Sequence, residues 1–473
     1  MRMIRLAAAF GLALGLSAPA LAQTFPATPP PIGQPKPFRV PATETFALPN
    51  GLSVTLIPYG IAPKTVVSLR VSAGNLNEGE RTWLADLTGQ MLKEGAAGRS
   101  SQALSQAAAG MGGDLNVTVT AQQTIIGMNV LSEHAAEAVR LVSDVARRPD
   151  FPESELARVK QNMGRDLAVA LSQPGPVASM VFARTYYGPQ HPYGRTFPTA
   201  EQLGGYQLAD IKGFYGENFG ARRSRLYVAG QFDAAAVKQA IQASFASWTA
   251  GPQRLSLPPS PKAGPQVVLV DRPGAPQSTI RLGFGVPRAG SEGDIPLRVT
   301  NALLGGAFSS RITRNIRESK GYTYSPGSGI VFQPDDALWT FQADVTTDVT
   351  GPALKEVFHE IRQLQTQPPG AEEAAGMRQY LAGTFILQNG SAATLVNSIA
   401  TRDLLGLPGD WLDRYVPRVL AVEPATMTRV AGERLPLGKM TLVVVGDLSK
   451  ITPQLKALPE LRDATFQTAS AVP

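Results

Sequence analysis

The sequence predicts an α+β protein of two homologous domains, each a mainly antiparallel or mixed sheet covered by helices. Residues 62–71 resemble residues 275–284 at an offset of 213 (275 − 62), and both segments alternate as half-buried strands do. Residues 224–230 resemble residues 440–446 at an offset of 216 (446 − 230). An offset that changes this little predicts a duplicated domain of about 210 residues.

Amphipathic helices are predicted between these strands in both halves. Apolar residues at helical spacing occupy one face of residues 354–364, behind Thr350 as the expected N-cap and Pro352 in the first turn. The same spacing occurs in residues 141–145, just before Pro149.

Proline-rich stretches divide the chain. Residues 1–22 are predicted to be a signal peptide and 23–44 a proline-rich leader, followed by a first domain at 45–250. A second proline-rich stretch at 251–266 is the predicted linker, and the second domain follows at 267–460.

The signal peptide prediction rests on three features. Arg2 and Arg5 make a basic start, and the apolar run that follows is too short to span a bilayer. Small residues then precede a cleavage site after Ala22. We therefore expect export, most simply to a bacterial periplasm, with an uncleaved anchor as the alternative. No later segment approaches 18 uncharged apolar residues, so no membrane span is expected.

Composition excludes several classes of function. The chain has no cysteine, which rules out disulfides and thiol chemistry. The net charge of +7 falls to +5 when Arg2 and Arg5 leave with the signal peptide (7 − 2 = 5). The remaining basic residues are interspersed with acidic ones, so we expect no nucleic-acid partner.

Histidine is equally scarce. The three histidines, His134, His191 and His359, are 57 (191 − 134) and 168 (359 − 191) residues apart, so a zinc site with two histidines on one helical turn cannot form. His191 is expected to lie in a loop. The glycines at 110–113 lack the lysine and threonine of a phosphate loop and are expected to form a turn into a strand at 115–119.

Four short motifs point to a known family. They are Leu-Pro-Asn-Gly-Leu at 48–52, Gly-Gly-Asp-Leu-Asn at 112–116, His-Pro-Tyr-Gly-Arg at 191–195 and Leu-Gly-Gly-Ala-Phe-Ser-Ser-Arg at 304–311. With the duplication, their order makes the chain resemble the pitrilysin/insulinase group of inverted zinc peptidases over about residues 44–450. The resemblance implies one half of a clam-shell chamber shared with a zinc-bearing homologue.

The resemblance also locates a missing metal site. Active members carry His-x-x-Glu-His, with two zinc ligands and a glutamate that activates water. In this chain those places fall on Asp86, Gly89 and Gln90, and the third ligand position falls near Asp166. We therefore expect no metal and no catalytic residue of that kind in this chain.

The helix itself is predicted to persist. Trp83, Leu87 and Met91 are spaced by four, and Gly95 is expected to cap the C-terminal end. A mid-helix glycine such as Gly89 costs about 1 kcal/mol relative to alanine. Two explanations stay open: sequence drift after catalysis was lost, or close approach of a neighbouring element.

The second half matches the family more closely. The resemblance implies that a zinc-free subunit supplies an arginine and a tyrosine seven positions apart, and Arg317 and Tyr324 have that spacing (324 − 317). Both side chains could donate hydrogen bonds to a developing oxyanion. Tyr322 is the competing tyrosine. Gly305 and Gly306 are expected either to let the backbone pass close to a peptide or to permit a turn. A surface arginine and a half-buried strand tyrosine are the structural alternatives.

The sequence thus predicts the non-catalytic subunit of a periplasmic zinc metalloendopeptidase. It would offer peptide-binding residues to a homologous zinc-bearing partner and bind no cofactor itself. The alternative is a non-hydrolytic peptide-binding or assembly scaffold, possibly a homodimer, that keeps the peptidase fold. A lone peptidase with another metal set is disfavoured by the histidine count.

Overall fold

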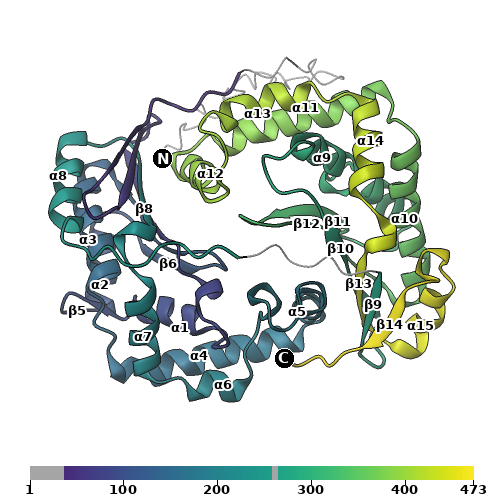
Figure 1. The fold of residues 1–473 in the computed structure, drawn as a ribbon, viewed down its shortest axis with the longest axis horizontal. Coiled ribbons are helices and arrows are strands. Elements are labelled where there is room, and N and C mark those ends of the chain that lie inside the picture. The colour runs from purple at the N-terminus through teal and green to yellow at the C-terminus, as the bar shows by residue number, and fades with distance from the viewer. Residues whose placement is uncertain (1–32, 34–36, 258–264) are drawn as a thin grey trace, which may run out of the picture. The chain divides into compact units, whose positions relative to one another are not determined.

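The computed structural model describes residue 33 and residues 37–257 and 265–473 (Figure 1). The predicted signal peptide at 1–22 lies outside the described residues, as do residues 258–264 of the predicted linker. Within the described ranges, no helix combines the length and the apolar character needed to cross a membrane.

The first half holds a mixed sheet with the strand order β1-β2-β8-β3-β7-β6. The bounds of its strands are β1 Glu44–Ala47, β2 Ser53–Pro58, β3 Lys64–Val71, β6 Leu115–Val119, β7 Thr124–Leu131 and β8 Ser224–Gly230, with β4 Gly95–Ala96 and β5 Arg99–Ser100 as a separate pair. Its helices are α1 Leu84–Met91, α2 Ser101–Gly110, α3 Ala135–Arg147, α4 Glu153–Ser172, α5 Pro174–Tyr187, α6 Ala200–Gly205, α7 Leu208–Asn218 and α8 Ala234–Phe245.

The second half holds another mixed sheet, with the order β11-β12-β10-β13-β9-β14. Its strands are β9 Gln266–Asp271, β10 Gln277–Gly285, β11 Gly327–Phe332, β12 Ala337–Thr346, β13 Thr441–Gly446 and β14 Thr465–Thr468. Its helices are α9 Asp294–Asn301, α10 Thr350–Thr366, α11 Ala371–Gln388, α12 Ala392–Leu404, α13 Trp411–Leu420, α14 Pro424–Arg434 and α15 Leu448–Lys456, with π-helical turns η5 Ala302–Gly306 and η6 Thr313–Ser319.

The two sheets repeat one topology. β2 runs parallel to β8 as β9 runs parallel to β13, and β3 pairs antiparallel with β8 and β7 as β10 pairs with β13 and β12. The sheets differ at one edge, where β1 is antiparallel to β2 but β14 is parallel to β9. The predicted fold class, two mixed sheets each accompanied by helices, is therefore confirmed.

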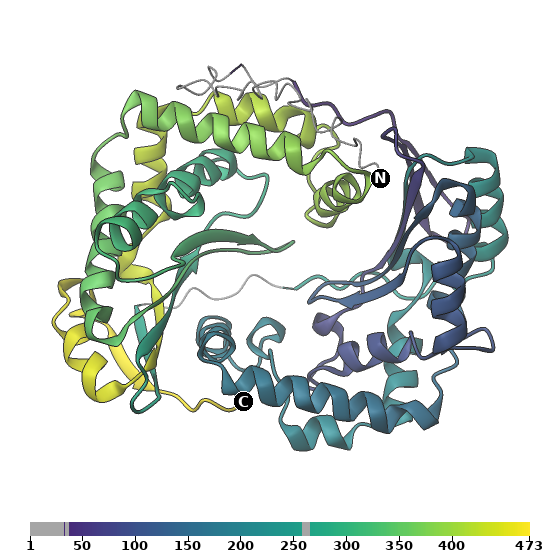
Figure 2. The ribbon, with the colours of Figure 1, turned by 180° about the vertical axis from the view of Figure 1, so that it is seen from behind.

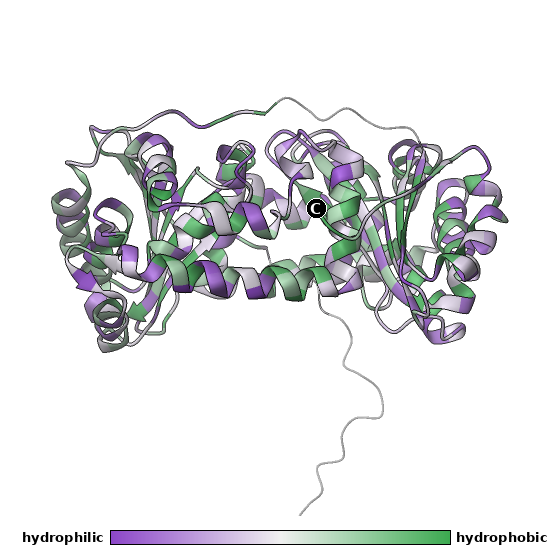
Figure 3. Ribbon diagram, turned by 90° about the horizontal axis from the view of Figure 1, so that it is seen from below, coloured by the Kyte–Doolittle hydropathy of each residue, from purple (hydrophilic) through white to green (hydrophobic). Residues whose placement is uncertain are grey.

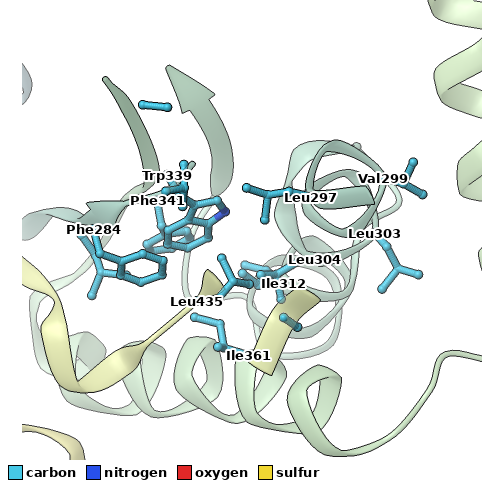
Figure 4. Packing of buried hydrophobic residues seen from close by; sticks show 14 of the residues in the cluster. Phe284, Leu297, Val299, Leu303, Leu304, Ile312, Trp339, Phe341, Ile361 and Leu435 are labelled. Atoms are coloured by element: carbon cyan, nitrogen blue, oxygen red, sulfur yellow. The ribbon is translucent and has the colours of Figure 1, made fainter. Parts of the chain in front are cut away.

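Each half has its own apolar core. In the second half, the ring of Trp339 stacks on Phe284 at 5.0 Å, and buried residues of α9, η5 and α10 pack around them (Figure 4). The helices carry green and purple residues side by side, as expected when one helical face is buried (Figure 3). The predicted helix at 354–364 lies within α10, and its five apolar side chains are buried.

The two halves exchange helices. Helix α5 of the first half packs on β13, β10 and β9 of the second sheet, and α12 of the second half packs on β8 and β3 of the first (Figures 1 and 2). The Tyr227 hydroxyl of β8 donates to Asp403 Oδ2 of α12 at 2.8 Å. The Arg70 guanidinium of β3 donates to Asn397 Oδ1 of α12 at 2.5 Å. Each sheet is thus covered on one face by a helix from the other half.

Two local predictions were wrong. Gly95 does not cap α1, because the helix ends at Met91 and Gly95 pairs with Ser100 in the β4–β5 ladder. Thr350 is not an N-cap but the first residue of α10. Its hydroxyl donates to the Thr347 carbonyl at 2.8 Å, and the N-cap residue, Val349, makes no side-chain cap hydrogen bond.

The end of the predicted leader packs on the second half. The Phe38 ring meets Phe385 of α11 edge-on, with the centroids 5.1 Å apart, and the Val40 N–H donates to Asp413 Oδ1 of α13 at 2.8 Å. These contacts fix residues 37–43, which have no regular secondary structure, against helices α11 and α13.

Candidate functional site

Helix α1 carries the face that the resemblance assigns to metal ligands. The helix is entered through Trp83, whose φ of 66° is left-handed. The buried Glu78 carboxylate accepts the Trp83 N–H at 3.0 Å and the Ala85 N–H at 2.9 Å. It therefore caps the first turn, because the N–H groups there have no partner within the helix.

A second carboxyl group lies beside this cap. Asp86 Oδ2 accepts the Asn75 amide at 2.6 Å, and the same amide lies 3.3 Å from Glu78 Oε2. Burial raises the pKa of Glu78 to about 8, against the opposing effect of the hydrogen bonds it accepts. Burial also raises the pKa of Asp86. At the start of α1, the buried carboxyl group of Glu78 and the partly buried carboxyl group of Asp86 are therefore held by one asparagine.

Gly89 is in close contact with strand β6. A Cβ atom at this position would lie 2.5 Å from Val119 Cγ2 and 3.7 Å from Val117 Cγ1. Of the two explanations from the sequence, the geometry supports close approach of a neighbouring element. Gln90 and Asp166, the other two assigned positions, are both exposed.

These residues do not fit zinc. A zinc site needs three or four nitrogen, sulfur or carboxylate ligands around one point, and the described part of the chain contains no group of three such side chains able to hold a metal. Gly89 offers no side chain, and the carboxylate of Asp86 is engaged by Asn75. We therefore derive no metal-dependent step within this chain.

The second candidate site is Arg317 with two aromatic side chains, Phe308 and Tyr324, beside it. The Arg317 Cζ atom lies 4.5 Å from the ring centroid of Phe308 and 5.0 Å from that of Tyr324. Both rings are exposed, Phe308 at 67% and Tyr324 at 79%. A guanidinium that contacts aromatic rings through its face leaves the N–H donors at its own edge free for a further partner. The structure thus brings Arg317 and Tyr324 together, with Phe308 as a third member.

The neighbouring arginines are used differently. Arg311 donates to both oxygens of Glu373, at 2.9 and 2.7 Å, and Arg314 donates to the same carboxylate at 3.0 Å. These hydrogen bonds lower the pKa of Glu373 and tie η6 to α11. Among the described residues no carboxylate pairs with Arg317, so its positive charge is available to a ligand.

Tyr322 lies elsewhere. It is half-buried and packs against the core of the second half, with its N–H bonded to the Ile316 carbonyl at 2.8 Å. Between the two tyrosines, Tyr324 is the one beside Arg317 and open to solvent.

Gly305 and Gly306 allow close approach. A Cβ at Gly305 would lie 2.5 Å from Ser328 Oγ of β11, and one at Gly306 would lie 2.6 Å from Asn301 Nδ2. They belong to the π-helical turn η5, and the next π-helical turn, η6, carries Arg317. Such turns are rare and are often found at functional sites. Gly305 therefore lets η5 pack close against β11, and Gly306 lets it pack close to Asn301 of α9.

Two residues of these sites were not identified from the sequence. Glu78 precedes its helix by six residues, outside the usual capping positions, and only the left-handed turn at Trp83 brings it back. Phe308 follows the glycine pair in a motif that was recognised, and an aromatic residue in such a loop was the available signal. His191 lies in a loop as expected, at the N-cap of a short 3₁₀ turn and 5.3 Å from the Tyr187 ring.

Comparison with known proteins relates both halves to one peptidase family. A family model described as insulinase (peptidase family M16) matches residues 57–195. A model described as peptidase M16 inactive domain matches residues 206–381. Together they cover helix α1 and the segment with Arg317.

Individual relatives agree with this. An uncharacterized zinc protease of Rickettsia felis is 24% identical over 343 residues, covering 72% of this chain and 82% of the relative. One from Bacillus subtilis is 21% identical over 383 residues, covering 80% and 92%. The crystal structure of a peptidase M16 inactive domain from Pseudomonas fluorescens is 22% identical with a TM-score of 0.78, covering 86% and 98%. A protease structure from Helicobacter pylori, 18% identical, has a TM-score of 0.79 and covers 86% and 100%.

Proposed function

Because the chain belongs to the insulinase family of peptidases, family M16, we propose that it is the zinc-free subunit of a zinc endopeptidase. A homologous subunit would carry the metal and the general base. The main support for the proposal is that the chain combines two features. Helix α1 lacks metal ligands at the positions that the resemblance assigns to them, and Arg317 lies beside the exposed Tyr324.

This subunit would bind and polarise the peptide. Arg317 has no carboxylate partner among the described residues, so it can donate to a peptide carbonyl oxygen, and the Tyr324 hydroxyl can donate beside it. When a carbonyl is attacked, negative charge grows on its oxygen, and fixed donors lower the barrier. Phe308 and Tyr324 hold the guanidinium in place before the substrate arrives, which reduces the ordering cost.

The location follows from the N-terminal sequence. We propose export to the periplasm with cleavage after Ala22, because residues 1–22 have the composition of a secretory signal. The zinc-bearing partner would be exported to the same compartment.

The test uses the assembled complex. The tagged chain is purified from its native host, co-purifying chains are identified by mass, and peptide cleavage is measured with and without a chelator. Arg317→Ala and Tyr324→Phe are expected to leave assembly intact and to lower turnover on the order of 100-fold. Arg314→Ala is the matched control, since Arg314 lies in the same turn but pairs with Glu373. We expect it to keep turnover within about 2-fold of the parent.

Other outcomes would contradict the proposal. If the Arg317→Ala complex cleaves peptides at the rate of the parent complex, Arg317 and Tyr324 do not have the proposed role. Peptide binding by a chain that never co-purifies with a zinc-bearing homologue would favour a scaffold. Chelator-sensitive cleavage by the purified chain alone would show that it is a complete peptidase.

A further inference from the structure

A pocket of about 310 Å³ lies in the second half, apart from the metal-ligand positions of α1. It is bounded by helix α11, strand β11 and the junction of α9 with η5. Its lining includes the aromatic and aliphatic residues Ile330, Phe332, Tyr380, Leu381, Phe385 and Tyr415. This is the lower end of the size range of pockets that bind small ligands, and it is large enough for one amino-acid side chain.

Arg298 and Asn301, two polar residues of the pocket, already have hydrogen-bond partners. Arg298 Nε donates to the buried Asp294 carboxylate at 2.7 Å, and its guanidinium stacks on Phe332 at 4.0 Å. Asn301 Oδ1 accepts from Ser328 Oγ and Trp339 Nε1, both at 2.7 Å. The pocket therefore presents no unpaired charge from these groups, and a charged occupant would lose its hydration without compensation.

The hydroxyl of Thr384 is also engaged. It donates to the Tyr380 carbonyl within α11 at 2.8 Å, so its methyl group is the part left for an occupant. The chemistry of the pocket thus favours a large apolar side chain over a charged one.

Strand β11 forms one wall and is the edge of its sheet. It pairs with β12 on one side, and no strand of the described chain pairs with the other. Ser328, Ile330 and Phe332 line the pocket, as alternate residues of a strand share one face. A Cβ at Gly329 would meet nothing within 4 Å, so the sheet face opposite the pocket is open at this residue. An extended peptide lying along this edge could place a side chain in the pocket.

The pocket and the arginine site are built from neighbouring segments of the chain. Gly306 lines the pocket and lies two residues before Phe308, while Tyr324 lies three residues before the start of β11. One extended peptide could therefore reach both the pocket and the Arg317 guanidinium.

We propose that the pocket between α11 and β11 binds one large apolar side chain, preferably aromatic, of an extended peptide. The inference rests on the proposed function in taking a peptide as its ligand, but it concerns selectivity rather than hydrolysis. The pocket would decide which peptides are held next to Arg317.

The test measures binding by the full chain alone. Fluorescein-labelled ten-residue peptides of serine, threonine and glycine carry one central Phe, Ala or Asp, and their Kd values are measured by anisotropy. The Phe peptide is expected to bind at least about 10-fold more tightly than the Ala peptide, and the Asp peptide no more tightly than the Ala peptide. Equal Kd values for Phe and Ala, or no binding of the Phe peptide at millimolar concentration, would overturn the proposal.

Thr384→Trp should fill the pocket and reduce the Phe-to-Ala preference to less than about 2-fold. Thr366→Trp is its matched control, because Thr366 also donates to the carbonyl four residues earlier, lies exposed on α10 and is not part of the pocket. It should keep the full preference. If Thr384→Trp keeps the preference as well, the peptide binds elsewhere and the proposal is wrong.

A second pair of variants keeps the proposal testable if Thr384→Trp does not fold. Tyr380→Ala removes a wall that is 44% exposed and should weaken binding of the Phe peptide about 5-fold or more, while Leu387→Ala, on the same helix but outside the pocket, should not. The two proposals can fail separately. The effect of Thr384→Trp on peptide binding by the isolated chain tests the pocket, whereas the effect of Arg317→Ala on turnover by the complex tests the proposed function.

Discussion

Gly89 illustrates how one residue can have two explanations until its neighbours are known. It lies in the middle of α1, where glycine costs about 1 kcal/mol relative to alanine. Its Cα faces Val119 so closely that any side chain would displace a stiff, β-branched neighbour. The packing of two elements, rather than helix propensity, therefore explains the glycine.

Gly89→Ala is expected to destabilise the protein by about 1–3 kcal/mol, because overpacking against Val119 outweighs the gain in helix propensity. Gly164→Ala is the matched control. Gly164 also lies inside a helix, α4, but a Cβ there would meet nothing within 4 Å, so this change should stabilise by about 0.5–1 kcal/mol. Urea denaturation midpoints of the two variants decide the matter, and a stabilising Gly89→Ala would refute the packing explanation.

The residues around Arg317 differ in how far the sequence could identify them. The spacing of Arg317 and Tyr324 is a property of the chain and was read directly. That Tyr324 is 79% exposed while Tyr322 packs against the core depends on how the segment turns after η6. The contact of Phe308 with Arg317 joins residues from different turns, so no local pattern contains it.

At the scale of elements, α1 was correctly predicted as a helix, but its C-terminal cap was not. Apolar residues spaced by four determined the helix. Glu78, from the segment before the helix, caps its start, and Gly95 pairs with Ser100 in the β4–β5 ladder instead of capping its end. Both are contacts between elements.

The Glu78 cap should make stability depend on pH. Burial raises its pKa to about 8 in the folded protein, so between about pH 4.5 and 8 the folded state holds a proton that the unfolded state releases. Stability should therefore fall as pH rises through this window, by about 1 kcal/mol per pH unit. Glu78→Gln should remove most of this slope, while the raised pKa of Asp86 contributes a remainder of the same sign.

Denaturation midpoints at pH 5 and pH 8 measure this effect. The exposed Glu80 lies two residues away, and Glu80→Gln should keep the parental pH dependence. If Glu78→Gln and the parent lose equal stability between pH 5 and pH 8, the prediction is wrong. The Glu78 carboxyl group is then ionised in the folded protein and caps the helix as a charged group.

At the scale of the whole molecule, the exchange of α5 and α12 couples the two halves. The Phe182 ring of α5 packs on the backbone of β10, where a Cβ at Gly283 would lie 2.8 Å from Phe182 Cζ. Removing α5 from the second sheet would expose this apolar contact, so we expect the halves to unfold together.

Phe182→Ala should lower the stability of both halves by about 3–5 kcal/mol, although the residue belongs to the first half of the chain. The four tryptophans allow the measurement: Trp83 and Trp248 report on the first half, and Trp339 and Trp411 on the second. Replacing either pair with Phe leaves fluorescence from one half only. Two different urea midpoints, or a shift confined to one half, would contradict the coupling.

The sequence by itself determined the duplicated α+β fold, the family and the absence of zinc ligands on α1. These follow from periodicity, a nearly constant offset and residue identity, which belong to the chain before it folds. Only the tertiary structure decided that Gly89 is packed against β6, that Phe308 joins Arg317, and that a pocket is open beside β11. The physical reason is that each of these is a contact between separate segments of the chain, and close packing fixes such contacts only when the segments have folded against each other.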